Sequence, residues 1–273
     1  PHNRVTFLDL ALPTRWDAAK QKRGGDLIAQ GIEEMRGRRY GTALLFLARG
    51  VSMAPADQRG RLELARLYMG AGYLPRAKQL LEDGLAYPPI ARAYTDLYFA
   101  VANYMEDHEA VLAAVNRLAP DAEPRLRRDL LTQQANALRR LERWDELDQI
   151  RHDNAAAPLI GVEQAWAQSQ LDRGTPAVAL AALDAQPELY GLPAERADLE
   201  SRLALAAGQF DRARTVAEAW RNSRPTDFGP RLLEVQLAIR ENFWFTAREK
   251  IVDYLVAFGA QPTLTAQLFI RLG

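Results

Sequence analysis

Residues 38–43 read RRYGTA, and 34 residues later residues 72–77 read GYLPRA. The same outline returns as GTPAVA at residues 174–179 and as GQFDRA at residues 208–213. Each stretch combines a turn with an apolar residue at its third position and an alanine at its sixth. A fixed period near 34 residues is typical of stacked helical hairpins. These stretches therefore predict the turns between paired helices.

The period continues outside the turns. Gly31, Ala43, Gly50 and Pro55 are followed 34 residues later by Ala65, Ala77, Gly84 and Pro89. Each unit has the pattern of an amphipathic helix, a tight turn, a second amphipathic helix and a proline or polar break. About seven units are expected, and they start near Gly24, Gln58, Arg92, Arg128, Ile160, Ala194 and Phe228.

The pattern resembles the tetratricopeptide repeat (TPR) family over most of the chain. Small residues match the family's position in the first helix: Gly31, Ala65, Ala135, Ala167 and Ser201. Aromatic residues match its position after the turn: Tyr40, Trp144, Phe210 and Trp244. Alanines match the residue that seats the second helix: Ala43, Ala77, Ala179, Ala213 and Ala247. The resemblance implies an all-α fold, a right-handed α-solenoid (superhelix) of TPR-like helical hairpins.

The expected organisation has four parts. Residues 1–23 form an apolar and basic segment, residues 24–158 hold repeats one to four, residues 159–259 hold repeats five to seven, and residues 260–273 form a capping or truncated helix. Two units depart from the pattern. The third has Phe99 at the small position and no turn glycine at residues 106–108, and the fourth has Leu147 in place of alanine. With the break before Pro158, these departures predict a bend near residue 158.

In the TPR family the first helices line a concave groove that binds a partner, and the resemblance implies the same surface here. Its middle section is polar and suits the carbonyls and carboxylates of an extended peptide: Asn103, Tyr104, Thr132, Asn136, Arg139, Arg140, Gln164, Gln168 and Arg202. Its early section is apolar: Ile28, Ile32, Met35 and Met69. The alternative is that Asn136, Arg139 and Arg140 form only a solvated helix face. Ile28 and Ile32 replace the polar residues with which some TPR proteins hold a C-terminal carboxylate, so that clamp is not expected.

An apolar early groove needs an occupant. The segment Val5–Pro13 is itself apolar. It is expected to cap this groove in its own chain, to dock on a partner protomer, or to pair with a sheet edge.

No pattern indicates catalysis, a cofactor or a metal. The chain has no cysteine, and its three histidines, His2, His108 and His152, fall far apart in sequence. Residues 23–25 (RGG) lack the lysine and the preceding strand of a phosphate-binding loop. They are interpreted as a linker into the first helix, with Asp26 near that helix's N-terminus. The five tryptophans are interpreted mainly as packing residues, with Trp16 and Trp166 the least clear.

Charge gives no preference for nucleic acid or an anionic membrane, because 35 basic side chains balance 35 acidic ones. A cluster of basic residues between Arg15 and Arg39 is diluted by acidic neighbours. No apolar run is long enough to cross a bilayer. The chain starts at Pro1 and ends in an apolar run, which favours either trimming behind an anchor or signal peptide, or simple loss of a methionine; the compartment stays open.

The sequence therefore predicts a non-enzymatic scaffold or adaptor that binds a protein or peptide in its groove. One alternative is a structural module for homo-oligomerisation or for a larger membrane-anchored assembly. A helical repeat that binds RNA is a further alternative.

Overall fold

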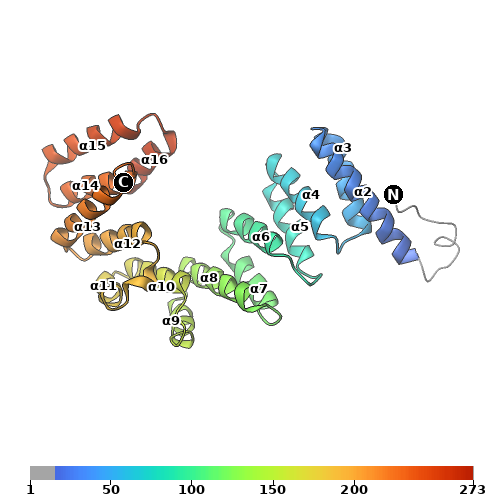
Figure 1. Cartoon of the computed structure of the whole chain (residues 1–273), viewed down its shortest axis with the longest axis horizontal. Helices are drawn as coiled ribbons and strands as arrows, with labels where there is room; N and C mark the ends of the chain where they lie inside the picture. The colour runs from blue at the N-terminus through green and yellow to red at the C-terminus, as the bar shows by residue number, and fades with distance from the viewer. Residues whose placement is uncertain (1–15, 273) are drawn as a thin grey trace. The chain divides into compact units, whose positions relative to one another are not determined.

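The computed structural model describes residues 16–272, and the segment Val5–Pro13 lies outside this range. The described residues form an all-α chain, as the repeat pattern predicts (Figure 1). The helices are α2 (Trp16–Arg36), α3 (Tyr40–Met53), α4 (Gln58–Gly70), α5 (Leu74–Gly84), α6 (Arg92–Tyr104), α7 (His108–Leu118), α8 (Pro124–Arg140), α9 (Trp144–Asp153), α10 (Ile160–Asp172), α11 (Pro176–Ala185), the 3-10 helix η2 (Pro187–Tyr190), α12 (Pro193–Ala206), α13 (Phe210–Ser223), α14 (Phe228–Arg240), α15 (Trp244–Phe258) and α16 (Pro262–Leu272).

The turn between the two helices of each hairpin contains one residue with positive φ. Between residues 16 and 272 these residues are Arg38, Gly72, Glu106, Glu142, Gly174, Gly208 and Asn242. Their spacing follows the repeat, and the hairpins α2–α3 to α14–α15 therefore number seven in the described chain. The third hairpin turns without glycine because Glu106 adopts the left-handed conformation, with φ of 55°.

The first helix starts earlier than the sequence predicts. α2 begins at Trp16 and continues through residues 23–25, so their interpretation as a linker is wrong, and Asp26 lies within the helix. A Cβ atom on Gly24 would lie 2.7 Å from the Cβ of Ala54 and 2.9 Å from the carbonyl oxygen of Gly50. Glycine at position 24 is thus a contact point where α2 and α3 approach closely, and the absence of a side chain is what permits that approach.

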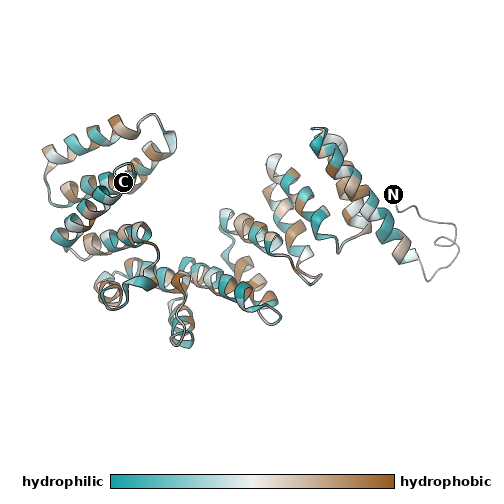
Figure 2. Ribbon diagram, in the orientation of Figure 1, coloured by the Kyte–Doolittle hydropathy of each residue, from teal (hydrophilic) through white to brown (hydrophobic). Residues whose placement is uncertain are grey.

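The chain divides into two compact units, one ending at Ala137 and one starting at Leu138. Every helix carries both apolar and polar residues (Figure 2). In the first unit Ile28, Leu47 and Leu64 lie in a shared core. In the second, Trp166, Leu203 and Leu233 lie in another. The bend near Pro158 and the superhelical sense remain predictions.

The five tryptophans differ in how far they are exposed to solvent. Trp166 is buried, Trp144 and Trp220 are half-buried, and Trp16 and Trp244 are exposed by 59% and 63%. The packing interpretation is therefore confirmed for Trp166 and wrong for Trp244.

One ion pair links the second repeat to the third. Lys78 on α5 binds the carboxylate of Asp107, which also accepts a hydrogen bond from the Ala110 amide at 3.1 Å and so caps α7. The hydrogen bond from Lys78 holds the pKa of the Asp107 carboxyl below its usual value of 3.8.

Because the pKa of Asp107 is depressed in the folded protein, its contribution to stability is complete above the unfolded-state pKa and is lost as pH falls through the folded-state pKa. In Lys78→Met, we expect the free energy of unfolding to decrease less than in the native chain when the pH is lowered below about 4. Urea unfolding at pH 7 and at pH 3 checks this. An unchanged difference between the two pH values would contradict the role of Lys78.

Candidate binding surfaces

An exposed stripe runs along α6 in the first unit. Tyr94, Tyr98, Val101 and Ala102 are buried, which turns the opposite side of the helix to solvent. The exposed stripe carries Arg92, Asp96, Ala100, Asn103 and Tyr104, and Tyr104 is 75% exposed. The buried tyrosines fix this orientation, because the Tyr94 hydroxyl donates to the Leu81 carbonyl at 2.9 Å and the Tyr98 hydroxyl donates to the Ala110 carbonyl at 3.1 Å.

Two side-chain bridges connect α6 to α8. The Asn103 side-chain amide donates to Oε1 of Gln133 at 3.0 Å, and Arg92 pairs with Asp129 at 2.9 Å. The first helices of the third and fourth repeats thus present neighbouring polar surfaces. Thr132 and Asn136 lie on the same part of α8 but bond to their own helix, Thr132 to the Arg128 carbonyl and Asn136 to the Thr132 carbonyl.

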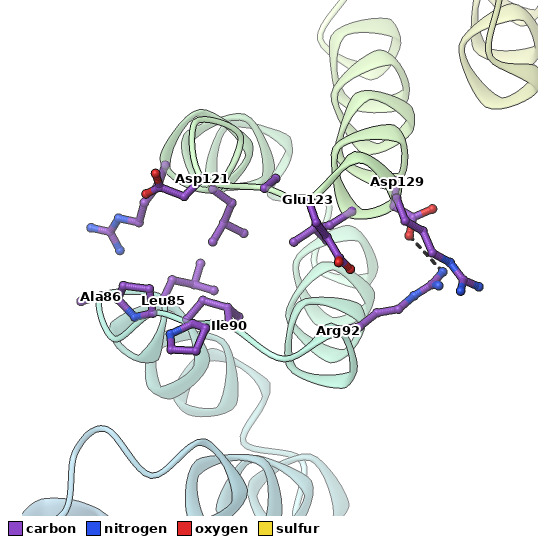
Figure 3. Close-up of a pocket in the computed structure, with 14 residues that line it drawn as sticks. Leu85, Ala86, Ile90, Arg92, Asp121, Glu123 and Asp129 are labelled. Atoms are coloured by element: carbon purple, nitrogen blue, oxygen red, sulfur yellow. Dashed lines mark ion pairs between the residues drawn. The ribbon is translucent and has the colours of Figure 1, made fainter.

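A pocket of about 820 Å³ lies between the connection that precedes α6 and the connection that precedes α8 (Figure 3). Leu85 and Ile90 project from one side of it in this view, and Leu118, Ala122 and Leu126 supply apolar surface from α7, the following connection and α8. The Arg92–Asp129 ion pair lies at one end. The pocket therefore combines apolar walls with a charged edge.

The edge of this pocket carries charges of both signs besides that pair: Arg117, Arg125, Asp121 and Glu123. Within the described part of the chain none of these four has an ion-pair partner. A ligand with both an acidic and a basic group matches such an edge better than a simple anion or cation does.

The predicted groove residues of the second unit are less available. Arg139 donates to Asp172 at 2.8 Å, and the Gln164 side chain donates to the Tyr190 carbonyl at 3.1 Å. Arg202 lies 3.6 Å from Asp198 on the same helix. Arg140 is exposed and Gln168 is half-buried. Arg139 therefore connects α8 to α10, and Gln164 connects α10 to η2.

The apolar early groove is not present as predicted. Ile28 is 2% exposed and Ile32 is 9% exposed, and both pack in the core of the first unit. Met35 and Met69 are half-buried. Ile28 has room to face inward because Gly50 and Gly60 lie beside it, where a Cβ would approach its side chain to 2.7 Å and 2.6 Å respectively.

Sequence reasoning missed two features of these surfaces. Gln133 is the partner that joins α8 to Asn103, and the repeat register did not place it on the groove. The pocket walls come from the connections between hairpins, which are the parts of the repeat with the least regular sequence. The cluster of prolines and apolar residues at 85–90 is the one signal that marked this connection as unusual.

The part of the chain from Trp16 to Leu272 contains no cluster of three or more histidine, aspartate or glutamate residues that could hold a metal ion. In the same part of the chain no helix is both long enough and apolar enough to cross a membrane.

Helix pairs of this length, repeated every 34 residues or so with one left-handed residue in each turn, define a solenoid of TPR-type hairpins. No family model matches the chain, and no curated protein matches it. Among solved protein structures, 34 chains match this chain.

Three of these structures illustrate the similarity. A tetratricopeptide repeat protein from Parabacteroides merdae is 13% identical, with a TM-score of 0.47, over 86% of this chain and 94% of that one. PilF of Pseudomonas aeruginosa is 14% identical, with a TM-score of 0.44, over 93% and 99%. A MamA structure is 21% identical, with a TM-score of 0.42, over 61% and 96%. At these identities and TM-scores the likeness carries no functional conclusion.

Proposed function

We propose that this chain is a non-catalytic scaffold that binds an extended segment of a partner protein along α6 and α8. The observation that carries the proposal is the exposed stripe of α6, joined to α8 by the Asn103–Gln133 amide pair. A repeat protein presents such a surface at fixed spacing because each hairpin packs on the next.

The amide pair offers the groups that an extended peptide needs. The hydrogen bond within the pair uses the Asn103 amide nitrogen and the Gln133 Oε1 atom, so the Asn103 Oδ1 atom and the Gln133 side-chain NH2 group remain as an acceptor group and a donor group. Peptide backbone presents the complementary donor and acceptor. Tyr104, beside this pair, adds an aromatic surface with a low entropic cost of ordering.

The pocket at the other end of α6 supports the same proposal. Its apolar walls would receive one apolar side chain of the bound segment. The four edge charges would contact the partner's backbone termini or charged side chains. The polar residues of the second unit, Gln168 and Arg202 among them, remain predicted binding residues of that unit.

The test is a peptide selected against the whole chain from a random library and titrated by fluorescence anisotropy. We expect Tyr104→Ala to weaken binding about tenfold, since exposed aromatic anchors commonly contribute more than 1 kcal/mol. Asn103→Ala should weaken it by a smaller factor. Tyr40→Ala is the matched control, because Tyr40 is a 56% exposed aromatic at the start of a second helix.

Equal affinities for the native chain and the Tyr104→Ala variant would contradict the assignment of this surface. Binding that weakens steeply with salt, and that single-stranded RNA competes away, would instead favour the RNA-binding alternative.

A further inference from the structure

The outer side of α15, in the seventh hairpin, is apolar. Phe245 is 87% exposed, Val252 is 52% exposed and Val256 is 82% exposed. Ala247 and Tyr254, on the opposite side of the helix, are buried. At about 100° per residue, positions 245, 249, 252 and 256 fall within roughly 60° of one another. They form one stripe along the helix, which we call the α15 stripe.

The hairpin fold does not require this stripe. Ala213 of α13 and Ala247 of α15 occupy equivalent positions of the repeat, 34 residues apart. At the places where α15 has its three apolar residues, α13 has Asp211, Glu218 and Asn222, all exposed. The sixth repeat thus has an ordinary solvated face, and the seventh has replaced it with aromatic and aliphatic side chains. An exposed apolar surface of this kind marks an interaction site.

Charged residues flank the stripe in an ordered way. Arg248 lies about 70° to one side of its centre, and Asp253 lies about 70° to the other, with Glu249 leaning toward the Asp253 edge. These three residues are exposed and have no ion-pair partner in the described part of the chain. Together with Phe245 and Val252 they line a shallow hollow of about 340 Å³. One edge of the stripe is therefore basic and the other acidic.

We propose that the α15 stripe binds the same stripe of a second copy of this chain, with the two α15 helices parallel. A twofold axis parallel to the helices places the basic edge of each copy against the acidic edge of the other. Arg248 then faces Asp253 of the second copy, five residues further along, which is the spacing of salt bridges that flank parallel helix pairs. Glu249, within the stripe, approaches its own symmetry mate, and the adjacent Arg248 of the second copy offsets that repulsion.

The same charges disfavour the antiparallel arrangement. There, basic edge meets basic edge and acidic edge meets acidic edge, so Arg248 would approach its own symmetry mate. Charge complementarity thus selects both the occupant and the orientation. The stripe covers only about three helical turns, so the dimer is expected to be weak, as small interfaces commonly are.

Sedimentation equilibrium of the full chain at micromolar to millimolar concentration tests the proposal. The expected mass rises with concentration from 30.6 kDa toward twice that value. Phe245→Asp, which introduces the residue that α13 has at this place, should weaken self-association at least about tenfold. Leu45→Asp is the matched control, because Leu45 is 72% exposed on α3. Circular dichroism confirms that both variants are folded.

Charge-reversal variants and single-cysteine variants test the orientation. Arg248→Asp should weaken the dimer, and adding Asp253→Arg to it should restore the dimer. Because the chain contains no cysteine, Val256→Cys gives a single thiol at one end of the stripe. It should form a disulfide with Val256→Cys of the second copy when the helices are parallel, whereas in the antiparallel arrangement the two thiols lie at opposite ends. Asn222→Cys, at the matching place on α13, should not form one.

Three results would overturn the proposal. One is a monomer at every concentration, and another is equal association of the native and Phe245→Asp chains. The third is loss of association when residues 1–15 are removed, which would show that this segment, and not the second stripe, covers α15.

Discussion

Gly84→Ala is expected to lower the free energy of unfolding by about 2 kcal/mol, because a single added methyl group has no room. A Cβ on Gly84 would lie 1.8 Å from the hydroxyl oxygen of Tyr94 and 2.6 Å from its Cζ atom. Tyr94 has no exposed surface, and its hydroxyl donates to the Leu81 carbonyl at 2.9 Å. The ring cannot move away without breaking that bond. Guanidinium unfolding followed by circular dichroism measures the loss.

Two variants make this result specific. Tyr94→Phe in the Gly84→Ala background removes the closest atom, so the pair should lose less stability than the sum of the single changes. Gly41→Ala is the control, because nothing lies within 4 Å of a Cβ there and alanine favours the helix. If Gly84→Ala proved as harmless as Gly41→Ala, the close packing of α5 on α6 would be refuted.

The second large effect concerns Arg151, whose removal is expected to lower the stability of the second unit by about 3 kcal/mol. Its guanidinium binds the buried Glu163 carboxylate at 2.8 Å and lies 3.7 Å from the centre of the Trp166 ring. In Arg151→Ala the Glu163 carboxylate would keep only the hydrogen bond from the Tyr190 hydroxyl, at 3.2 Å. A buried charge without its counter-ion is costly. The measurement is the same unfolding experiment.

An exposed ion pair supplies the control. Arg143 donates to Glu146 through two hydrogen bonds of 2.6 Å and 2.8 Å at the protein surface, and Arg143→Ala should leave stability unchanged within error. Adding Glu163→Gln to Arg151→Ala should recover part of the loss, since the buried carboxylate is then neutral. No recovery would mean that the lost packing on Trp166, and not the unpaired charge, causes the effect.

The regular part of this fold was predictable from sequence. Alanines such as Ala43, Ala77 and Ala213 have no exposed surface in the structure, because the approach of two helices at a fixed place constrains residue size. The turns were also predictable, although Glu106 and Glu142 occupy left-handed positions where glycine is usual. The periodic spacing identified these turns where residue type alone did not.

The binding surfaces were less predictable, since one residue type can have different roles: a glycine can lie in a linker or at a helix contact, and an isoleucine can line a groove or a core. The sequence around Gly24 is typical of a linker into the first helix, yet Gly24 lies within α2 and permits contact between α2 and α3. Ile28 has the register of a groove residue, but the glycines around it create the space that buries it. Which side of a helix faces inward depends on residues that are distant in sequence, and the position of a residue within the repeat does not identify those residues. The α15 stripe required comparing exposure between repeats.

Within the first unit, α2 packs on α3 and α4, and α4 packs on α5 and α6, so a helix contacts little beyond the adjacent hairpin. In a chain joined in this way, no single long-range contact holds the whole unit together. Under tension applied at its ends, such a chain is expected to unfold one hairpin at a time and to refold by adding each hairpin to a folded neighbour.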